Sequence, residues 1–165
     1  MRKAVTTLGL GVAAAVMLTA SPAQAGGWNT SISEIKNGHT GKCLSGSGRT
    51  VSQETCGLPV SGGVRSTDWD FYDNENSLVK LVRNKATGLC LDTNGTNVYL
   101  SGCTTSDPGQ LWVVNTCDQV LGSLTYNRDL VGWNTGGVSL ESDKTGTDYD
   151  KIVWRVSGFP TGCGG

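Results

Sequence analysis

The sequence predicts an all-β fold made of three similar units, each of roughly 40 to 45 residues with about four strands. Two observations predict this fold. Cysteines and tryptophans recur at nearly constant spacing, and the segments between them are short and rich in β-branched and aromatic residues. No 11-residue window after residue 25 has a convincing helical period, so helices are not expected.

Residues 1–25 have the features of a secretory signal peptide. A basic start is followed by an apolar run over residues 4–20 and by the Ala-x-Ala cleavage pattern of residues 23–25. A retained membrane helix fits less well, because the run is short for a bilayer span and ends in a cleavage pattern. We therefore expect a secreted mature chain that begins at Gly26, with residues 26–33 as a flexible arm carrying Trp28.

The folded domain is expected to cover residues 34–165, with repeats over about 34–74, 75–116 and 117–160. In each of the first two repeats two cysteines stand 13 positions apart and a tryptophan follows: Cys43, Cys56 and Trp69, then Cys90, Cys103 and Trp112. Trp154 lies 42 positions after Trp112, close to the 43 between the first two tryptophans. With Trp154 as a guide, we take Val131 as the equivalent of the first cysteine, so the third repeat has lost this cysteine pair.

Several short segments between these marks predict strands: 78–83, 98–100, 111–114 and 152–156. Asn94-Gly95 predicts a tight turn, since both residues tolerate positive φ. The 24 glycines are typical of a chain with many turns.

Charge and cysteine content exclude several classes of function. Without residues 1–25 the chain has eleven lysines and arginines against fourteen aspartates and glutamates, a net charge of −3, so binding to nucleic acid is not expected. Membrane insertion is not expected either, because no second apolar stretch is long enough to cross a bilayer. Six cysteines in an exported chain predict three disulfides. Zinc is the alternative, but His39 is the single histidine and Cys-x-x-Cys pairs are absent. We expect no metal, no cofactor and no catalytic residue.

The segment Asn84 to Asp92, followed by Cys103 and by Gln110-Leu111-Trp112, resembles one repeat of a ricin-B-type lectin, whose signature is the Gln-x-Trp ending. The resemblance is weaker in the first repeat and weakest in the third. It implies a β-trefoil whose repeat tryptophans share one core, and disulfides Cys43–Cys56 and Cys90–Cys103, which leaves Cys117 to pair with Cys163. The alternative is an unrelated sandwich with accidental spacing.

The resemblance also implies where a sugar would bind. In the family an aspartate follows the first cysteine, an aromatic ring stands two residues before the second, and a polar residue precedes Gln-x-Trp. The second repeat supplies Asp92, then Ser101 in place of the ring, and Gly109 before Gln110; Tyr99 is a partial substitute for the ring. The corresponding pairs are Ser45 with Glu54 in the first repeat and Trp133 with Glu141 in the third. Asp92 has a second interpretation, as the cap of the Thr93-Asn94-Gly95 turn.

Because most sugar-contact residues are missing, the sequence favours protein recognition. Trp28 on the arm and Trp133 are the candidate contacts, and the long loop 57–67 is a further one. Either tryptophan could instead pack on the domain. We expect a non-catalytic adaptor subunit of a larger secreted assembly, with a toxin complex as one candidate assembly. The expected partner is a secreted protein or a glycan. The alternatives are a lectin using Asp92, Tyr99, Ser101 and Gln110, and a trefoil protease inhibitor.

Overall fold

Three four-stranded repeats organise the computed structural model, which describes residues 27–57, 63–73, 78–115, 119–142 and 146–157. The first repeat contains β2 (Ile35–Asn37), β3 (Cys43–Ser47), β4 (Thr50–Glu54) and β5 (Trp69–Asp73). The second contains the interrupted strand β6 (Val79–Lys80) and β7 (Val82–Asn84), then β8 (Cys90–Thr93), β9 (Val98–Ser101) and β10 (Trp112–Asn115). The third contains β11 (Val120–Ser123), β12 (Arg128–Gly132), β13 (Val138–Glu141) and β14 (Trp154–Val156).

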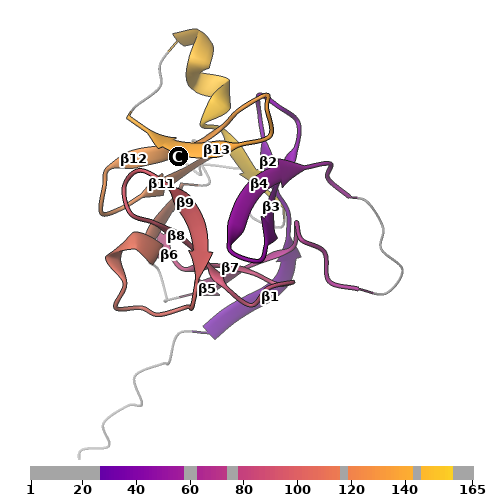
Figure 1. Cartoon of the computed structure of the whole chain (residues 1–165), viewed down its shortest axis with the longest axis vertical. Helices are drawn as coiled ribbons and strands as arrows, with labels where there is room; N and C mark the ends of the chain where they lie inside the picture. The colour runs from indigo at the N-terminus through magenta and orange to yellow at the C-terminus, as the bar shows by residue number, and fades with distance from the viewer. Residues whose placement is uncertain (1–26, 58–62, 74–77, 116–118, 143–145, 158–165) are drawn as a thin grey trace, which may run out of the picture.

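Strand pairing closes the three repeats into a ring (Figure 1). The last strand of each repeat pairs with the first strand of the next: β5 with β7, β10 with β11, and β14 with β2. Two short 3-10 helices, η1 (Pro108–Gln110) and η2 (Gly146–Lys151), precede β10 and β14. Within the described ranges the structure contains no helix long and apolar enough to cross a membrane.

The repeat tryptophans occupy equivalent places in one core. Each is at most 1% exposed, and each indole N–H donates a hydrogen bond to a leucine carbonyl oxygen of its own repeat. The pairs are Trp69 with Leu44 (3.0 Å), Trp112 with Leu91 (2.9 Å) and Trp154 with Leu130 (2.7 Å). A buried indole N–H needs an acceptor, so these bonds fix the side chains that fill the centre of the fold.

The same bonds correct the alignment of the third repeat. Leu44 and Leu91 each follow a cysteine, whereas Leu130 follows Asp129, so Asp129 and not Val131 stands at the first cysteine position. Backbone conformation supports this alignment. Gly41, Gly88 and Asn127 each lie two positions before the first cysteine position of their repeat, and all three have left-handed backbone (φ 67°, 71° and 49°). Alignment on tryptophan misplaced the repeat because the leucine-to-tryptophan separation varies, at 25, 21 and 24 residues.

The segment predicted to be a flexible arm is largely a strand. β1 (Gly27–Ser33) pairs antiparallel with β5 and continues through Glu34 into β2, as β6 continues into β7. β1 stands at one end of the nine-stranded sheet, with β14 at the other, and Figure 1 shows β1 at the lower edge of the ring. Backbone pairing with β5 and the packing of Trp28 described below explain why this end of the chain is ordered.

Two of the expected disulfides are confirmed. Cys43–Cys56 and Cys90–Cys103 each close a loop with a sequence separation of 13 in their own repeat. In the loop-entropy account each bridge stabilises the fold by about 3 kcal/mol. Cys117 and Cys163 lie outside the described residues, so their pairing stays a prediction.

Candidate functional site

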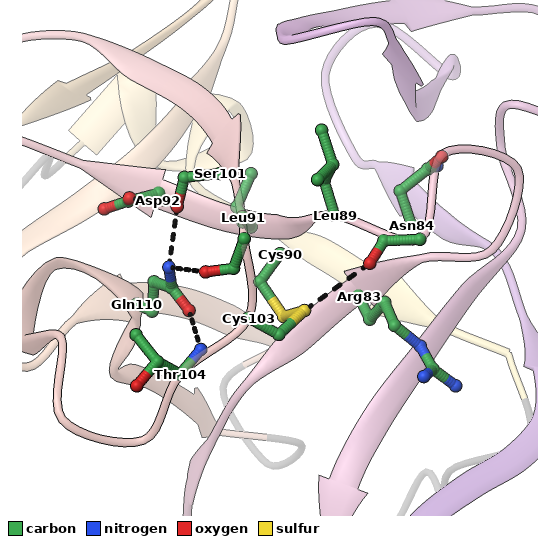
Figure 2. Close-up of a disulfide and its surroundings, with 12 residues drawn as sticks. Arg83, Asn84, Leu89, Cys90, Leu91, Asp92, Ser101, Cys103, Thr104 and Gln110 are labelled. Carbon is green, nitrogen blue, oxygen red and sulfur yellow. Dashed lines mark hydrogen bonds between the residues drawn. A yellow bond between two sulfur atoms is a disulfide. The ribbon is translucent and has the colours of Figure 1, made fainter.

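The residues predicted for the sugar site of the second repeat lie on the β8–β9 hairpin and η1. Figure 2 shows three of them, Asp92, Ser101 and Gln110, close together. Asp92 on β8 faces Tyr99 on β9, and Cys90 faces Ser101. The Ser101 hydroxyl donates to Asp92 Oδ2 (2.5 Å) and accepts from Gln110 Nε2 (2.6 Å). A continuous hydrogen-bonded chain, Asp92–Ser101–Gln110, therefore connects three of the four predicted residues.

Gln110 holds η1 against β9 from a fully buried position. Its amide also donates to the carbonyl oxygen of Gly102 (2.8 Å), and its Oε1 accepts from the backbone N–H of Thr104 (2.9 Å). The polar atoms of this side chain are thus used within the fold, as a buried amide requires. Gln110 contributes to structure here, and the Gln-x-Trp signature is explained by this role.

Asp92 is closed off from solvent, with a 2% exposed fraction. Its Oδ1 accepts from the backbone N–H of Thr93 (2.6 Å), so both carboxylate oxygens have internal donors. Gly109 covers the same group: a Cβ placed there would lie 2.5 Å from Asp92 Oδ1 and 2.3 Å from the carbonyl oxygen of Thr93. This position, where the family has a polar sugar contact, has no room for any side chain.

Tyr99 and Ser101 are the half-buried members of the group, whereas Asp92 and Gln110 are buried. Partial burial raises the pKa of its phenol, and the negative charges of Asp92 and Asp107 add to the rise. The neighbouring turn, with Gly95 at φ 86°, is covered by the ring of Tyr126, which a Cβ on Gly95 would approach to 2.7 Å. Tyr126 belongs to the third repeat, so no pattern within the second could have indicated it.

The corresponding positions of the other repeats lack the acceptor carboxylate. Ser45 is fully buried, and Glu54 accepts a hydrogen bond from the hydroxyl of Ser66 (2.8 Å). In the third repeat Val131 is buried at the acceptor position, and Trp133 lies two residues beyond it, which corrects the sequence alignment.

Trp133 is half-buried against its own hairpin. Its indole N–H donates to Ser139 Oγ (2.9 Å), and the Lys151 ammonium lies 5.2 Å from the ring centroid, within cation–π range. The Ser139 hydroxyl in turn donates to Glu141 (3.1 Å). Trp133 therefore has defined neighbours while one part of its ring stays accessible.

Trp28 also combines packing with exposure. Its ring meets Tyr72 edge to face, with 5.4 Å between centroids, and the guanidinium of Arg83 lies 4.0 Å above it. Arg83 is held by an ion pair with the buried Asp70 (2.6 Å). These contacts form a fixed surface of Trp28, Tyr72 and Arg83, which we name the β1 face.

A sequence profile for the ricin-type β-trefoil lectin domain matches residues 31–130, more than half of the chain. No curated protein sequence matches this chain. Among solved structures, the Haemophilus ducreyi cytolethal distending toxin is similar at 14% identity and a TM-score of 0.62, over 83% of this chain and 90% of that one.

Two further structures cover nearly all of the matched protein. The designed threefold-symmetric protein ThreeFoil has 21% identity and a TM-score of 0.60, over 76% of this chain and 96% of that one. SeviL, solved with the asialo-GM1 saccharide, has 14% identity and a TM-score of 0.58, over 80% and 97%. At these identities the likeness concerns the fold, and the predicted β-trefoil is confirmed.

Proposed function

The chain belongs to the family of ricin-type β-trefoil lectin domains, and on this basis we propose the finer role of a lectin-like protein with no catalytic activity of its own. It is secreted through residues 1–25 and acts mainly as a protein-binding subunit of a larger secreted assembly. Disulfides in its first two repeats fit an oxidising compartment. The likeness to a cytolethal distending toxin supports a toxin as the kind of assembly.

The buried state of Asp92 is the observation that carries this proposal. A sugar hydroxyl that bound Asp92 would have to replace the Ser101 or Thr93 hydrogen bond and displace the backbone at Gly109. Breaking a satisfied, buried hydrogen bond costs about 1–3 kcal/mol. A monosaccharide site with a millimolar Kd binds with only about 4 kcal/mol in total, so this cost would remove about a quarter to three quarters of the binding free energy.

The β1 face is the surface best suited to a protein partner. Tryptophan, tyrosine and arginine are the side chains enriched at the energetic centres of protein interfaces. Trp28 and Arg83 are already held by Tyr72 and Asp70, so little conformational entropy is lost when a partner binds. The outermost position of β1 in its sheet adds a strand edge beside these side chains.

The test is recovery of the tagged mature chain from its native culture medium. A secreted protein should co-purify with the wild type and with Tyr149→Ala, a change at another exposed aromatic residue, and should be lost with Trp28→Ala. Retention of the partner by Trp28→Ala would remove the β1 face from the proposal. Absence of any stoichiometric partner would remove the adaptor role.

A stand-alone lectin is the second candidate. It is favoured by the Asp92–Tyr99 pairing and by the ring of Tyr126 against the adjacent turn, which places two aromatic side chains near the carboxylate. Specific glycan-array binding that is abolished by Asp92→Ala would establish this candidate and contradict the closed-site argument. Protease inhibition has only the fold as support, and a protease panel without loss of activity would exclude it.

A further inference from the structure

A surface hollow of about 360 Å³ lies between the second and third repeats, away from Asp92. Its lining includes Val113 and Asn115 of β10, Val120 and Gly122 of β11, and Asp129 of β12. Its volume is in the lower part of the range of small-molecule sites. In the register of the sheet, Val113 faces Gly122, Gly122 faces Asp129, and Asn115 faces Val120, so these side-chain positions share one outward face.

The other two repeat junctions show why the hollow forms here. At each junction three residues face one another in a row across three adjacent strands, which are the last strand of one repeat and the first two strands of the next. The rows are Arg155–Lys36–Cys43, Asp70–Arg83–Cys90 and Val113–Gly122–Asp129. The central position has a long basic side chain in the first two rows and glycine in the third. The last position holds a disulfide cysteine in two rows and a carboxylate in the third.

Arg83 shows what the absent side chain does elsewhere. It extends across its junction to Asp70 at 2.6 Å and lies above the Trp28 ring at 4.0 Å, so the space beside its strand is occupied. At Gly122 nothing replaces it, and a Cβ there would come within 2.9 Å of Asp129 Oδ1. The Asp129 carboxylate therefore lies directly beside the backbone of Gly122, at the wall of the hollow.

The lining has two chemically different sides. Val113 and Val120 are apolar, whereas Asp129, Asn115 and Asn127 supply a carboxylate and two amides. Arg128, at the rim, is oriented by its hydrogen bond to the carbonyl oxygen of Gly95 (3.0 Å). A pyranose ring has the matching character, because its C–H groups form a weakly apolar face while its hydroxyls donate and accept at the edge. Except for Asn127, which lies in the turn before β12, the residues that provide these groups come from three neighbouring strands of one sheet.

We propose that the Gly122–Asp129 hollow is a binding site for a single monosaccharide unit at the end of a glycan, with Asp129 accepting from sugar hydroxyls. This site differs from the Asp92 position of the second repeat, and it does not depend on the adaptor role. Among the described residues that line the hollow none is aromatic, so binding of the free sugar is weak, with a Kd in the range of about 1–10 mM.

The test uses backbone amide chemical shifts of the mature chain, titrated with the methyl glycosides of galactose, glucose, mannose, N-acetylglucosamine and N-acetylgalactosamine. At least one should shift the amides of Gly122, Ser123 and Asp129. Gly122→Lys restores the residue type of the equivalent position, Lys36, and should weaken binding at least about tenfold, or 1.4 kcal/mol. Gly122 does not have positive φ, and its nearest neighbour is a flexible carboxylate, so the variant should fold.

Two further variants complete the experiment. Asp129→Asn keeps the size of the side chain but removes its charge, and it should weaken binding to a similar extent. This variant can replace Gly122→Lys in the test if Gly122→Lys is too unstable to study. Gly137→Lys, where the nearest atom to a new Cβ is Thr135 Oγ1 at 3.8 Å, is the matched control and should bind like the wild type.

Three outcomes would overturn the proposal: no shift with any glycoside, shifts confined to the surroundings of Asp92 and Tyr99, or shifts produced equally by butylammonium, which would indicate a simple cation site. None of these outcomes bears on partner recovery from culture medium, so the adaptor role is tested separately.

Discussion

Asp92 and Ser101 stand on neighbouring strands, and the serine hydroxyl donates to the carboxylate at 2.5 Å while it accepts from Gln110 at 2.6 Å. A serine at the family's ring position thus replaces a stacking surface by a hydrogen-bond connector. This connector holds η1 against the hairpin of the second repeat. The Asp92 carboxylate takes part in it and is therefore occupied within the fold.

Ser101→Ala tests the connector. The change leaves one oxygen of Asp92 and one donor of Gln110 without this partner in a buried place, so the free energy of unfolding should fall by about 1–3 kcal/mol. Urea denaturation measures the loss, with Ser142→Ala at an exposed position as control. Equal stability of the two variants would contradict the structural role assigned to this group.

Gly109→Ala tests the closure over Asp92. The new methyl group would lie 2.3 Å from the carbonyl oxygen of Thr93, so η1 must shift, and overpacking of this kind costs about 1–3 kcal/mol. The same substitution at Gly102, where a Cβ has nothing within 4 Å, should be nearly neutral. Thermal melts of the pair provide the comparison, and similar melting temperatures would show that η1 is less closely packed than described.

Tyr99 gives a prediction in alkaline solution. Its pKa lies above the ordinary value of 10.0, first because of burial and then because of Asp92 and Asp107. The folded state therefore holds the phenolic proton more tightly than the unfolded state, so this contribution to stability is present below the ordinary pKa and is lost as the pH rises through the raised one. Tyr99→Phe should make the pH dependence of unfolding shallower in that window.

Absorbance titration of the tyrosines checks the same shift directly. The difference between wild type and Tyr99→Phe isolates the one phenol, and Asp92→Asn should bring its pKa down by removing the second cause. A Tyr99 pKa at the ordinary value in the wild type would show that the ring is more solvated than the structure has it.

Peptide mapping under non-reducing conditions tests the third bridge. We expect one fragment joining Cys117 to Cys163, in addition to the fragments of Cys43–Cys56 and Cys90–Cys103. Reduced Cys117 or Cys163, or either cysteine linked to a second molecule, would contradict this pairing.

The sequence predicted what each repeat does by itself. The family resemblance, together with the equal cysteine spacing, implied two disulfides that are confirmed, and Trp69, Trp112 and Trp154 all proved to be core residues, because both features depend on contacts within one repeat. The sequence also singled out Asp92, Ser101 and Gln110, which the structure brings together, but it did not indicate that the group is closed to solvent. The closure depends on how close the backbone of Gly109 lies to Asp92, and the identity of the residue at position 109 does not reveal that distance.

What the sequence could not predict lies between repeats. Trp28 is ordered by Tyr72 and Arg83 from two other strands, and Tyr126 covers a turn of the preceding repeat. The Gly122–Asp129 hollow becomes visible only when the three junction rows are compared in register. The third repeat was misaligned by its tryptophan because the connecting segments differ in length, which only the indole hydrogen bonds resolve.

The indole hydrogen bonds also indicate which segments of the chain can be exchanged as whole units. Trp69, Trp112 and Trp154 each donate to a leucine carbonyl of their own repeat, 21 to 25 positions earlier, so a backbone cut between two repeats leaves all three bonds inside single fragments. A cut between Leu91 and Trp112 separates one of them. Repeats can therefore be swapped or reshuffled as whole modules, with the junction rows as the surfaces that must be matched again.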